Sequence, residues 1–164
     1  MKEVLKAILP IKDKLYRYAL RIVGNEMTAE DVVQEVLIKV WQKKSDLEKI
    51  ENKEAWCMTV TRNLALDKLR RKKVIHDNVD DHRNIADNGM TPYRSLQSDD
   101  TMGIIQHAMS QLPESQQQVI HLRDVEGYSY QEIADITGYS LDKVKVYLHR
   151  ARITLRHKLT SIYA

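Results

Sequence analysis

Basic residues are concentrated at two places in this chain, and their spacing suits contact with nucleic acid rather than bond-making chemistry. Residues 70–73 are four consecutive bases at the end of a segment with helical periodicity. Basic side chains at a helix C-terminus stabilise the helix dipole, but four in a row exceed what the dipole needs. From residue 143 onward the chain has six bases and no acid. Both clusters therefore favour contact with phosphate groups.

The second basic cluster belongs to a pattern typical of a helix-turn-helix. Residues 129–152 read SYQEIADITGYSLDKVKVYLHRAR, with an amphipathic segment on each side of a turn. Ser129 with Glu132 predicts a capping box at the start of the first segment. Gly138 supplies the bend, and Ser140 caps the second segment. A short helix, a glycine-containing turn and a longer helix make up a helix-turn-helix.

The longer of these two predicted helices has an apolar side and a polar side. The apolar residues recur at three- and four-residue steps, and we expect them to be buried: Leu141, Val144, Leu148, Ala151 and Leu155. Four residues fall on the other side, namely Lys145, Val146, His149 and Arg150. That side can enter a major groove, where lysine and arginine reach phosphates or guanine edges and a valine meets a thymine methyl group.

Residue types that serve catalysis are present, but they lack a catalytic pattern. The chain has no phosphate loop of the GxxxxGKS or GxxxxGKT kind, no HExxH motif and no CxxC motif. His107, His121 and His157 stand singly on predicted helices, which favours structural or surface roles. Cys57 and Ser129 have no patterned base beside them. We therefore expect no enzymatic activity, no cofactor and no metal site.

One group in the middle of the chain resembles a set of metal ligands by composition: His76, Asp77, Asp80, Asp81 and His82. The surrounding stretch is rich in Asp and Asn and has no sustained apolar repeat, so no scaffold fixes the geometry that a metal needs. Solvated charge explains the group better. We expect residues 76–100 to form a flexible acidic linker.

The composition indicates helices and a reducing environment. The chain has only five glycines and three prolines and no phenylalanine, while 43% of its residues are hydrophobic, which favours helices with aliphatic cores. The single cysteine cannot form an internal disulfide, so we expect a cytoplasmic protein. No apolar run has membrane-spanning length, and the start lacks the apolar stretch of a secretion signal. We therefore expect no direct membrane insertion.

Charge divides the chain into three parts. Residues 1–75 hold 17 Lys plus Arg against 11 Asp plus Glu, residues 76–100 hold 2 against 6, and residues 101–164 hold 7 against 6. Helical periodicity occurs on both sides of the acidic stretch. We therefore predict an all-α chain of two small domains, 1–75 and 101–164, joined by the linker.

The first domain is predicted to contain three or four helices. Its opening segment bends or breaks near Pro10 and ends at Gly24 and Asn25. The apolar stripe of that segment consists of Leu5, Ile8, Leu15, Ala19 and Ile22. Thr28 is predicted to cap the next helix, with Asp31 as its capping-box partner.

The two remaining helices of this domain are separated by a predicted polar loop at residues 43–54. The helix AEDVVQEVLIKVW is expected to bury Val33, Val36 and Val40 and to direct Asp31, Gln34, Glu35 and Lys39 outward. The helix AWCMTVTRNLALDKLRRKK carries Trp56, Val60 and Leu64 at helical spacing. Trp41 and Trp56 favour core or interface positions.

The second domain also shows helical patterns before its helix-turn-helix. Residues 99–111 predict one helix. Pro113 suits the first turn of the next helix, PESQQQVIHLRDVE, and Gly127 can end it.

Three of these motifs, in this order, resemble bacterial RNA polymerase sigma factors of the extracytoplasmic-function group. AEDVVQEVLIKVW resembles the polymerase-binding helix of that family, and AWCMTVTRNLALDKLRRKK resembles its minus-10 recognition and melting helix. QLPESQQQVIHLRDVEGYSYQEIADITGYSLDKVKVYLHRAR resembles sigma domain 4, which reads the minus-35 element. The group keeps only sigma domains 2 and 4 joined by a linker, and the three motifs cover nearly the whole chain.

The resemblance implies roles for individual residues. The set that would meet the clamp of the largest polymerase subunit is Asp31, Gln34, Glu35 and Lys39. The minus-10 set would be Asn52, Trp56, Arg62, Asn63, Asp67, Lys68, Arg70 and Arg71, with Asn52 in the loop that holds a flipped base. The minus-35 set would be Lys145, Val146, His149, Arg150 and Arg152. At Val146 and Tyr147 many relatives carry a smaller polar residue and a base, which leaves promoter specificity open.

The resemblance also implies a function and partners. The chain would bind core RNA polymerase and direct promoter recognition, DNA melting and transcription initiation. Its partners would be core RNA polymerase, promoter DNA and an anti-sigma factor, and its linker would thread polymerase channels or act as a mere spacer. A DNA-binding regulator that acts without polymerase is the alternative, because response-regulator output domains share the helix-turn-helix. The first domain lacks the alternating strands and helices of a receiver, which favours the sigma factor.

Overall fold

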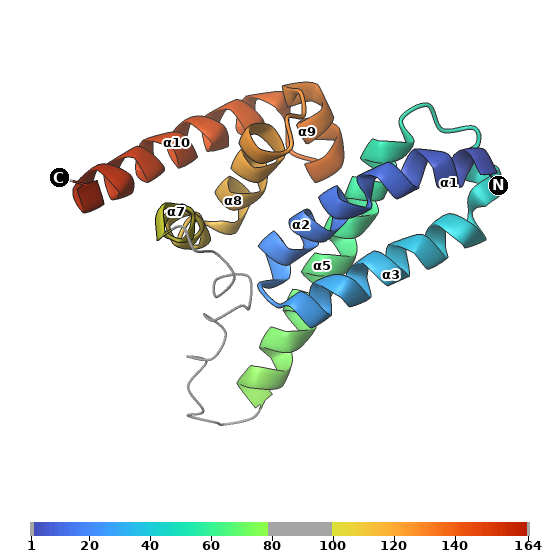
Figure 1. Ribbon diagram of the computed structural model, residues 1–164, viewed down its shortest axis with the longest axis horizontal. Helices are drawn as coiled ribbons and strands as arrows, with labels where there is room; N and C mark the ends of the chain where they lie inside the picture. Colours follow the sequence, from blue (N-terminus) through green and yellow to red (C-terminus); the bar gives the residue numbers. More distant parts are fainter. Residues whose placement is uncertain (1, 79–99, 164) are drawn as a thin grey trace.

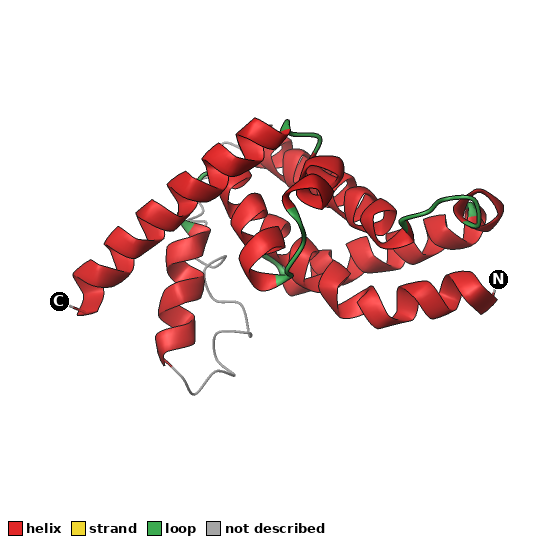
Figure 2. Cartoon of the chain, turned by 90° about the horizontal axis from the view of Figure 1, so that it is seen from above, coloured by secondary structure: helices red, strands yellow, loops and turns green. Residues whose placement is uncertain are grey.

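The computed structural model describes residues 2–78 and 100–163, and every regular element in these ranges is helical (Figure 1, Figure 2). The all-α prediction is confirmed for this part of the chain. Residues 79–99, which make up most of the predicted linker, lie outside the described residues. So do Asp80, Asp81 and His82 of the group that resembled metal ligands.

The first helical segment is interrupted at its proline, as predicted. α1 (Lys2–Ile8) leads into a short 3-10 turn, η1 (Leu9–Ile11), and α2 (Lys12–Val23) follows. Most of the predicted stripe is buried or partly buried, but Leu5 is 38% exposed, so its assignment to the core was wrong. Val4, one residue earlier, is buried instead.

The next helix, α3 (Glu26–Gln42), begins three residues earlier than predicted. Its N-cap is Asn25, because the Asn25 side chain accepts a hydrogen bond from the backbone N–H of Thr28 at 2.9 Å. The assignment of Thr28 as the cap, with Asp31 as its partner, was therefore wrong. Gly24 ends α2 with φ +69°, and asparagine directly after it supplies a side chain at least as good for capping as threonine.

The segment predicted as a polar loop contains a short helix, α4 (Lys44–Leu47), which precedes α5 (Lys53–Asn78). Leu47 is fully buried and fixes this segment to the core. The core side of α5 includes Cys57, Met58 and Ala65, which are fully buried. The residues noted at helical spacing, Trp56, Val60 and Leu64, are partly buried against that core.

The second half of the chain contains α7 (Asp100–Ser110), α8 (Glu114–Ile120), the π turn η3 (His121–Val125), α9 (Tyr130–Thr137) and α10 (Leu141–Tyr163). Pro113 is the N-cap of α8 rather than a residue of its first turn, since its ψ is 147°. The sequence patterns did not predict the π turn. At its end, Gly127 has φ +82°.

The helix-turn-helix is formed by α9 and α10, with the predicted caps. Ser129 and Glu132 form the capping box, and Gly138 ends α9 with φ +77°. The Ser140 side chain accepts a hydrogen bond from the backbone N–H of Lys143 at 3.2 Å, which caps α10. Of the predicted apolar stripe, Leu141 is 38% exposed, so that assignment was wrong.

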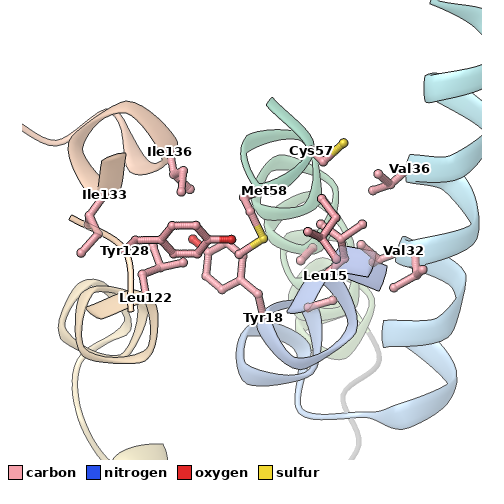
Figure 3. Packing of buried hydrophobic residues seen from close by; sticks show 14 of the residues in the cluster. Leu15, Tyr18, Val32, Val36, Cys57, Met58, Leu122, Tyr128, Ile133 and Ile136 are labelled. Atoms are coloured by element: carbon pink, nitrogen blue, oxygen red, sulfur yellow. The ribbon is translucent and has the colours of Figure 1, made fainter. Parts of the chain in front are cut away.

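The two halves pack against each other through one continuous core. Residues of α2 and α5 contact α8, η3 and α9, and Figure 1 shows the first set of helices beside the second. Figure 3 shows Tyr18 and Met58 facing Leu122 and Tyr128 across the boundary. All four side chains are buried. The sequence had given no indication of this contact.

Candidate nucleic-acid interface

The polar side of α10 is open to solvent, as the helical periodicity predicted. Lys145, Val146, His149 and Arg150 are all exposed. On the opposite side Val144, Leu148 and Ala151 are buried against the rest of the second half. One helix therefore offers bases, an imidazole and an apolar side chain together, which is the chemistry needed to contact phosphates and base edges in a major groove.

Tyr147 has a packing role that the sequence patterns did not identify. Its ring lies edge-on to the ring of Tyr139, with 5.3 Å between the ring centroids. Tyr139 is in the turn between α9 and α10, so this aromatic pair links the turn to the second helix. Tyr147 therefore contributes to holding the helix-turn-helix together.

Arg152 differs from the other residues of the predicted minus-35 set, because it is held by a carboxylate. Its guanidinium donates two hydrogen bonds to Asp124, at 2.6 and 3.1 Å. These hydrogen bonds raise the pKa of Arg152 above its usual range. The pair joins α10 to η3 and is partly exposed, so Arg152 positions the helix in this structure while its side chain remains accessible to solvent.

The predicted minus-10 set is divided between an exposed face of α5 and other positions. Asn63, Asp67, Arg70 and Arg71 are exposed along α5. Arg70 Nη1 lies 3.7 Å from Oδ1 of Asp67, which is one helical turn earlier. Lys68 lies nearby and donates to Glu35 of α3 at 3.0 Å. These five residues make one polar surface with three bases and one acid, which a DNA backbone can approach.

Arg62, also assigned to the promoter surface, is covered by the second half of the chain. Its Nε donates to Gln118 Oε1 at 2.7 Å, and its guanidinium lies 5.4 Å from the centroid of the Tyr139 ring. The structure thus separates Arg62 from the exposed bases of α5.

Asn52 and Trp56 lie at the start of α5. The Asn52 side chain accepts a hydrogen bond from the backbone N–H of Ala55 at 2.9 Å, so it caps the helix while its residue remains exposed. Trp56 is partly buried against the core, in agreement with its predicted core or interface position. The structure brings both residues to the N-terminal end of α5, away from Arg70 and Arg71 at the other end.

The outward face of α3 combines polar and apolar side chains. Asp31, Gln34 and Lys39 are exposed, and Glu35 is partly exposed. The same helix exposes Ile38 at 55% and Trp41 at 57%. Ile38 was not in the predicted set. Its position outside the buried valine stripe of α3 could have indicated that it lies on the outward face. A mixed face of this kind suits a protein partner.

The described residues provide little for catalysis. Burial raises the pKa of the Cys57 thiol to about 12, with a smaller contribution from the nearby Glu54 carboxylate, so this thiol is a poor nucleophile. Within residues 2–78 and 100–163, no three His, Cys, Asp or Glu side chains are grouped to hold a metal ion. No helix in the same ranges is long and apolar enough to cross a membrane.

Two family profiles match the chain in sequence. Residues 9–74 match the family described as Sigma-70 region 2, and residues 102–155 match the family described as Sigma-70, region 4. Among individual proteins, the chain is 33% identical over 150 residues to the ECF RNA polymerase sigma factor SigE of Mycolicibacterium smegmatis. The matched region covers 90% of this chain and 58% of that protein.

Two further similarities extend over most of both partners. The chain is 32% identical over 156 residues to the ECF RNA polymerase sigma factor SigL of Mycobacterium tuberculosis, covering 90% of this chain and 84% of that protein. In three dimensions it is similar to the sigma factor RpoE in complex with the anti-sigma factor NepR from Bartonella quintana. That match has a TM-score of 0.80, 25% sequence identity and 98% coverage of both chains.

Proposed function

This chain belongs to the extracytoplasmic-function group of sigma-70 RNA polymerase sigma factors, and from that premise we propose that it directs core RNA polymerase to a specific set of promoters. The observation that carries the proposal is the presence of sigma regions 2 and 4, in that order, within one short helical chain. Sigma factors are not enzymes, and the chain contributes binding rather than bond-making chemistry. The proposed domains are 1–75 and 101–164, although α5 runs to Asn78 and α7 begins at Asp100, so both helices extend into the linker expected at 76–100.

The polymerase contact is the outward face of α3. Asp31, Gln34, Glu35 and Lys39 supply the polar contacts, and the exposed Ile38 and Trp41 add apolar area. Aromatic side chains of this kind carry much of the binding energy in protein interfaces when they are buried by the partner.

The minus-10 contact is α5 together with the loop before it. The exposed charged face of α5 attracts the DNA backbone, and Arg62 joins it when the two halves are apart. Asn52 and Trp56, at the start of α5, lie next to bases that leave the stack. Capture of unstacked bases opens the duplex at a cost of a few kcal/mol for each base, and no nucleotide hydrolysis by this chain is needed.

The minus-35 contact is the exposed side of α10, which comprises Lys145, Val146, His149 and Arg150, with Arg152 beside them. Each domain alone offers a small basic surface, which binds DNA weakly and with strong salt dependence. When both domains are held on one polymerase, their effective concentration at the two promoter elements rises. Promoter selection therefore requires the assembled holoenzyme.

Two further proposals concern the setting. An anti-sigma factor binds this chain and keeps it inactive, as NepR forms a complex with the similar RpoE. The chain acts in the cytoplasm, where core polymerase and promoters are found.

The test of the function is a mobility-shift assay with a pool of genomic fragments. Specific fragments should be shifted only when the chain and core polymerase are both present. If the chain were a regulator that acts without polymerase, it would shift those fragments in the absence of polymerase.

A further inference from the structure

Arg152 of α10 is paired with Asp124 of η3 through one edge of its guanidinium. Nε donates to Oδ2 of Asp124 at 3.1 Å, and Nη2 donates to Oδ1 at 2.6 Å. Arginine offers a rigid planar fork of N–H donors, and the carboxylate uses only the edge formed by Nε and Nη2. The Arg152 side chain is 45% exposed. Its guanidinium can therefore bind a second anion while it stays paired with Asp124.

Arg152 belongs to a row of basic side chains along α10. The row consists of Lys145, His149, Arg152 and Arg156, which follow one another at steps of four, three and four residues and are all exposed. This spacing places them on one side of the helix. The row lies between the buried side of α10 and the outermost side, which carries Arg150. In a helix that enters a major groove with its outermost side first, such a flanking row faces the phosphate backbone rather than the base edges.

The turn that carries Asp124 is fixed in place by hydrogen bonds. The backbone N–H of Glu126 donates to the His121 carbonyl at 3.0 Å, which closes the π turn. The His121 side chain is buried. Next to Asp124, Nη1 of Arg123 donates to the Tyr128 carbonyl at 2.8 Å, which ties the turn to the segment after it. Asp124 therefore projects toward α10 from a rigid support.

We infer that Asp124 is a positioning residue for minus-35 recognition, which holds one edge of the Arg152 guanidinium so that the other edge meets a phosphate of the promoter. This role rests on the proposed function, since holoenzyme makes the promoter contact. A long arginine side chain loses rotamer entropy when it binds. A carboxylate on a rigid turn fixes the guanidinium before DNA arrives, so less entropy is lost on binding. An acid in the minus-35 domain thereby strengthens the binding of an anion.

Simple electrostatics would give Asp124 the opposite effect. A carboxylate close to the DNA backbone repels it, and a carboxylate that pairs with Arg152 competes with phosphate for the same guanidinium. If charge alone mattered, Asp124→Asn would strengthen promoter binding. If Asp124 positions Arg152, the same substitution weakens promoter binding, because asparagine forms no ion pair and has only one oxygen to accept hydrogen bonds.

The experiment measures the affinity of holoenzyme for one retained promoter fragment at several salt concentrations. Asp124→Asn should weaken binding about fivefold, the upper range for a partly exposed ion pair. Arg152→Gln should weaken it at least as much and should lessen the slope of log K against log salt concentration by about 0.9, which corresponds to one phosphate. Asp124→Asn should lessen the slope too, although that variant keeps every base. Unchanged or tighter binding by Asp124→Asn would overturn the positioning role.

The double variant tests whether Asp124 acts through Arg152. Asp124→Asn combined with Arg152→Gln should bind no more weakly than Arg152→Gln alone, because the group that Asp124 positions is already gone. Asp124→Glu, which keeps the carboxylate, should retain most of the affinity. Additive losses in the double variant would show that the two residues act separately and would overturn the positioning role.

Two comparisons separate the positioning of Arg152 from the stability of the fold. Asp135→Asn makes the same charge change in α9, where the carboxylate accepts a hydrogen bond from Gln131 rather than from an arginine, and it should not weaken promoter binding. The exchange of Asp124→Arg with Arg152→Asp should restore thermal stability, because the ion pair is rebuilt. It should not restore promoter binding, because an acid then lies in the basic row. Recovery of promoter affinity by the exchange would show that only the link between α10 and η3 matters, and would overturn the positioning role.

The positioning role and the proposed function are rejected by different results. Wild-type holoenzyme that retains the fragment, together with an Asp124→Asn variant that binds it equally well, would reject the positioning role and leave the proposed function in place. A wild-type chain that gives core polymerase no retained fragment would reject the proposed function and the positioning role together. Circular dichroism of the full chain establishes that each variant is folded.

Discussion

Lys68 of α5 donates a hydrogen bond to Glu35 of α3, with 3.0 Å between Nζ and Oε1. Lys68 belongs to the residues proposed to contact the promoter, and Glu35 belongs to those proposed to contact polymerase. Both side chains are partly exposed, so the pair contributes less than about 1 kcal/mol to stability. Breaking this ion pair so that Glu35 contacts polymerase and Lys68 contacts the promoter therefore costs little free energy. The proposed polymerase surface and the proposed promoter surface are adjacent on the protein.

Charge reversal at Glu35 should weaken capture of core polymerase. Glu35→Arg removes a carboxylate from the proposed contact and places a second base beside Lys68. Pull-down with purified core polymerase measures the loss, and circular dichroism should show unchanged helical content. The matched control is Glu30→Arg, which makes the same charge change at an exposed position of α3 outside the polymerase set. Wild-type capture by Glu35→Arg would contradict the assignment of this face.

Neutralising the four consecutive bases at residues 70–73 should reduce the salt dependence of promoter binding by holoenzyme. Replacement by glutamine removes up to about four phosphate contacts, so the plot of log K against log salt concentration should become less steep by the corresponding amount. Lys2 and Lys6, exposed on α1, provide a control in which two bases are removed away from the proposed DNA surface. A slope that does not change on replacing residues 70–73 would leave them only the role of stabilising the helix C-terminus.

Substitution on the exposed side of α10 should alter sequence preference. If Arg150 contacts a base edge through two hydrogen bonds, Arg150→Ala should cost roughly 1–3 kcal/mol on the preferred promoter and relax selection at one base pair. Selection from a randomised minus-35 library with wild-type and variant holoenzymes measures this. Leu148→Asp is the contrasting variant, since it should unfold the domain. Identical preferred sequences from wild type and Arg150→Ala would remove Arg150 from base recognition.

Acid should destabilise the contact around His121 and Glu126. Burial lowers the pKa of His121, and the Arg21 and Arg17 guanidiniums lower it further against the opposing effect of Glu126. The pKa of a histidine in the unfolded chain is about 6.5, so below that pH the unfolded chain binds a proton that the buried ring does not. The free energy of unfolding should then fall with decreasing pH, by up to about 1.4 kcal/mol per pH unit for one proton.

Glu126 extends the same trend to lower pH. Burial alone would raise its pKa, but the adjacent His121 ring, 3.2 Å away, and the hydrogen bonds from Arg17 outweigh burial and lower the pKa to about 2 from the ordinary value of 4.5. Its stabilising contribution is present above about 4.5 and is lost as the pH falls toward 2. Thermal unfolding between pH 5 and 8, with His121→Gln compared with the exposed control His157→Gln, isolates the histidine. A wild-type slope in His121→Gln would reject its role.

Local patterns in the sequence predicted local structure well. The capping box of Ser129 and Glu132 was found because both partners lie within four residues. The choice between Asn25 and Thr28 failed because both residue types cap helices and differ little in preference. Leu5 and Leu141 were misassigned for a different reason. Periodicity gives the side of a helix on which a residue lies, but it does not give the position where the packing partner ends.

The contact between the two halves could not be predicted in this way. Tyr18 and Gln118 are 100 residues apart in sequence, and neither belongs to a motif that requires the other. A glutamine and an arginine on amphipathic helices are most often solvent-exposed. The burial of Gln118 and the partial burial of Arg62 depend on the docking of two helical surfaces, so they are known only from the three-dimensional structure.

Transcription from genomic fragments with purified core polymerase tests the central claim most directly. Reactions contain core polymerase alone, core polymerase with the wild-type chain, or core polymerase with Glu35→Arg. The account predicts defined transcripts from a subset of fragments, present with the wild-type chain, absent without it and reduced with Glu35→Arg. Binding of the chain to DNA without any transcript that depends on it would contradict the account and would identify a regulator that acts without polymerase.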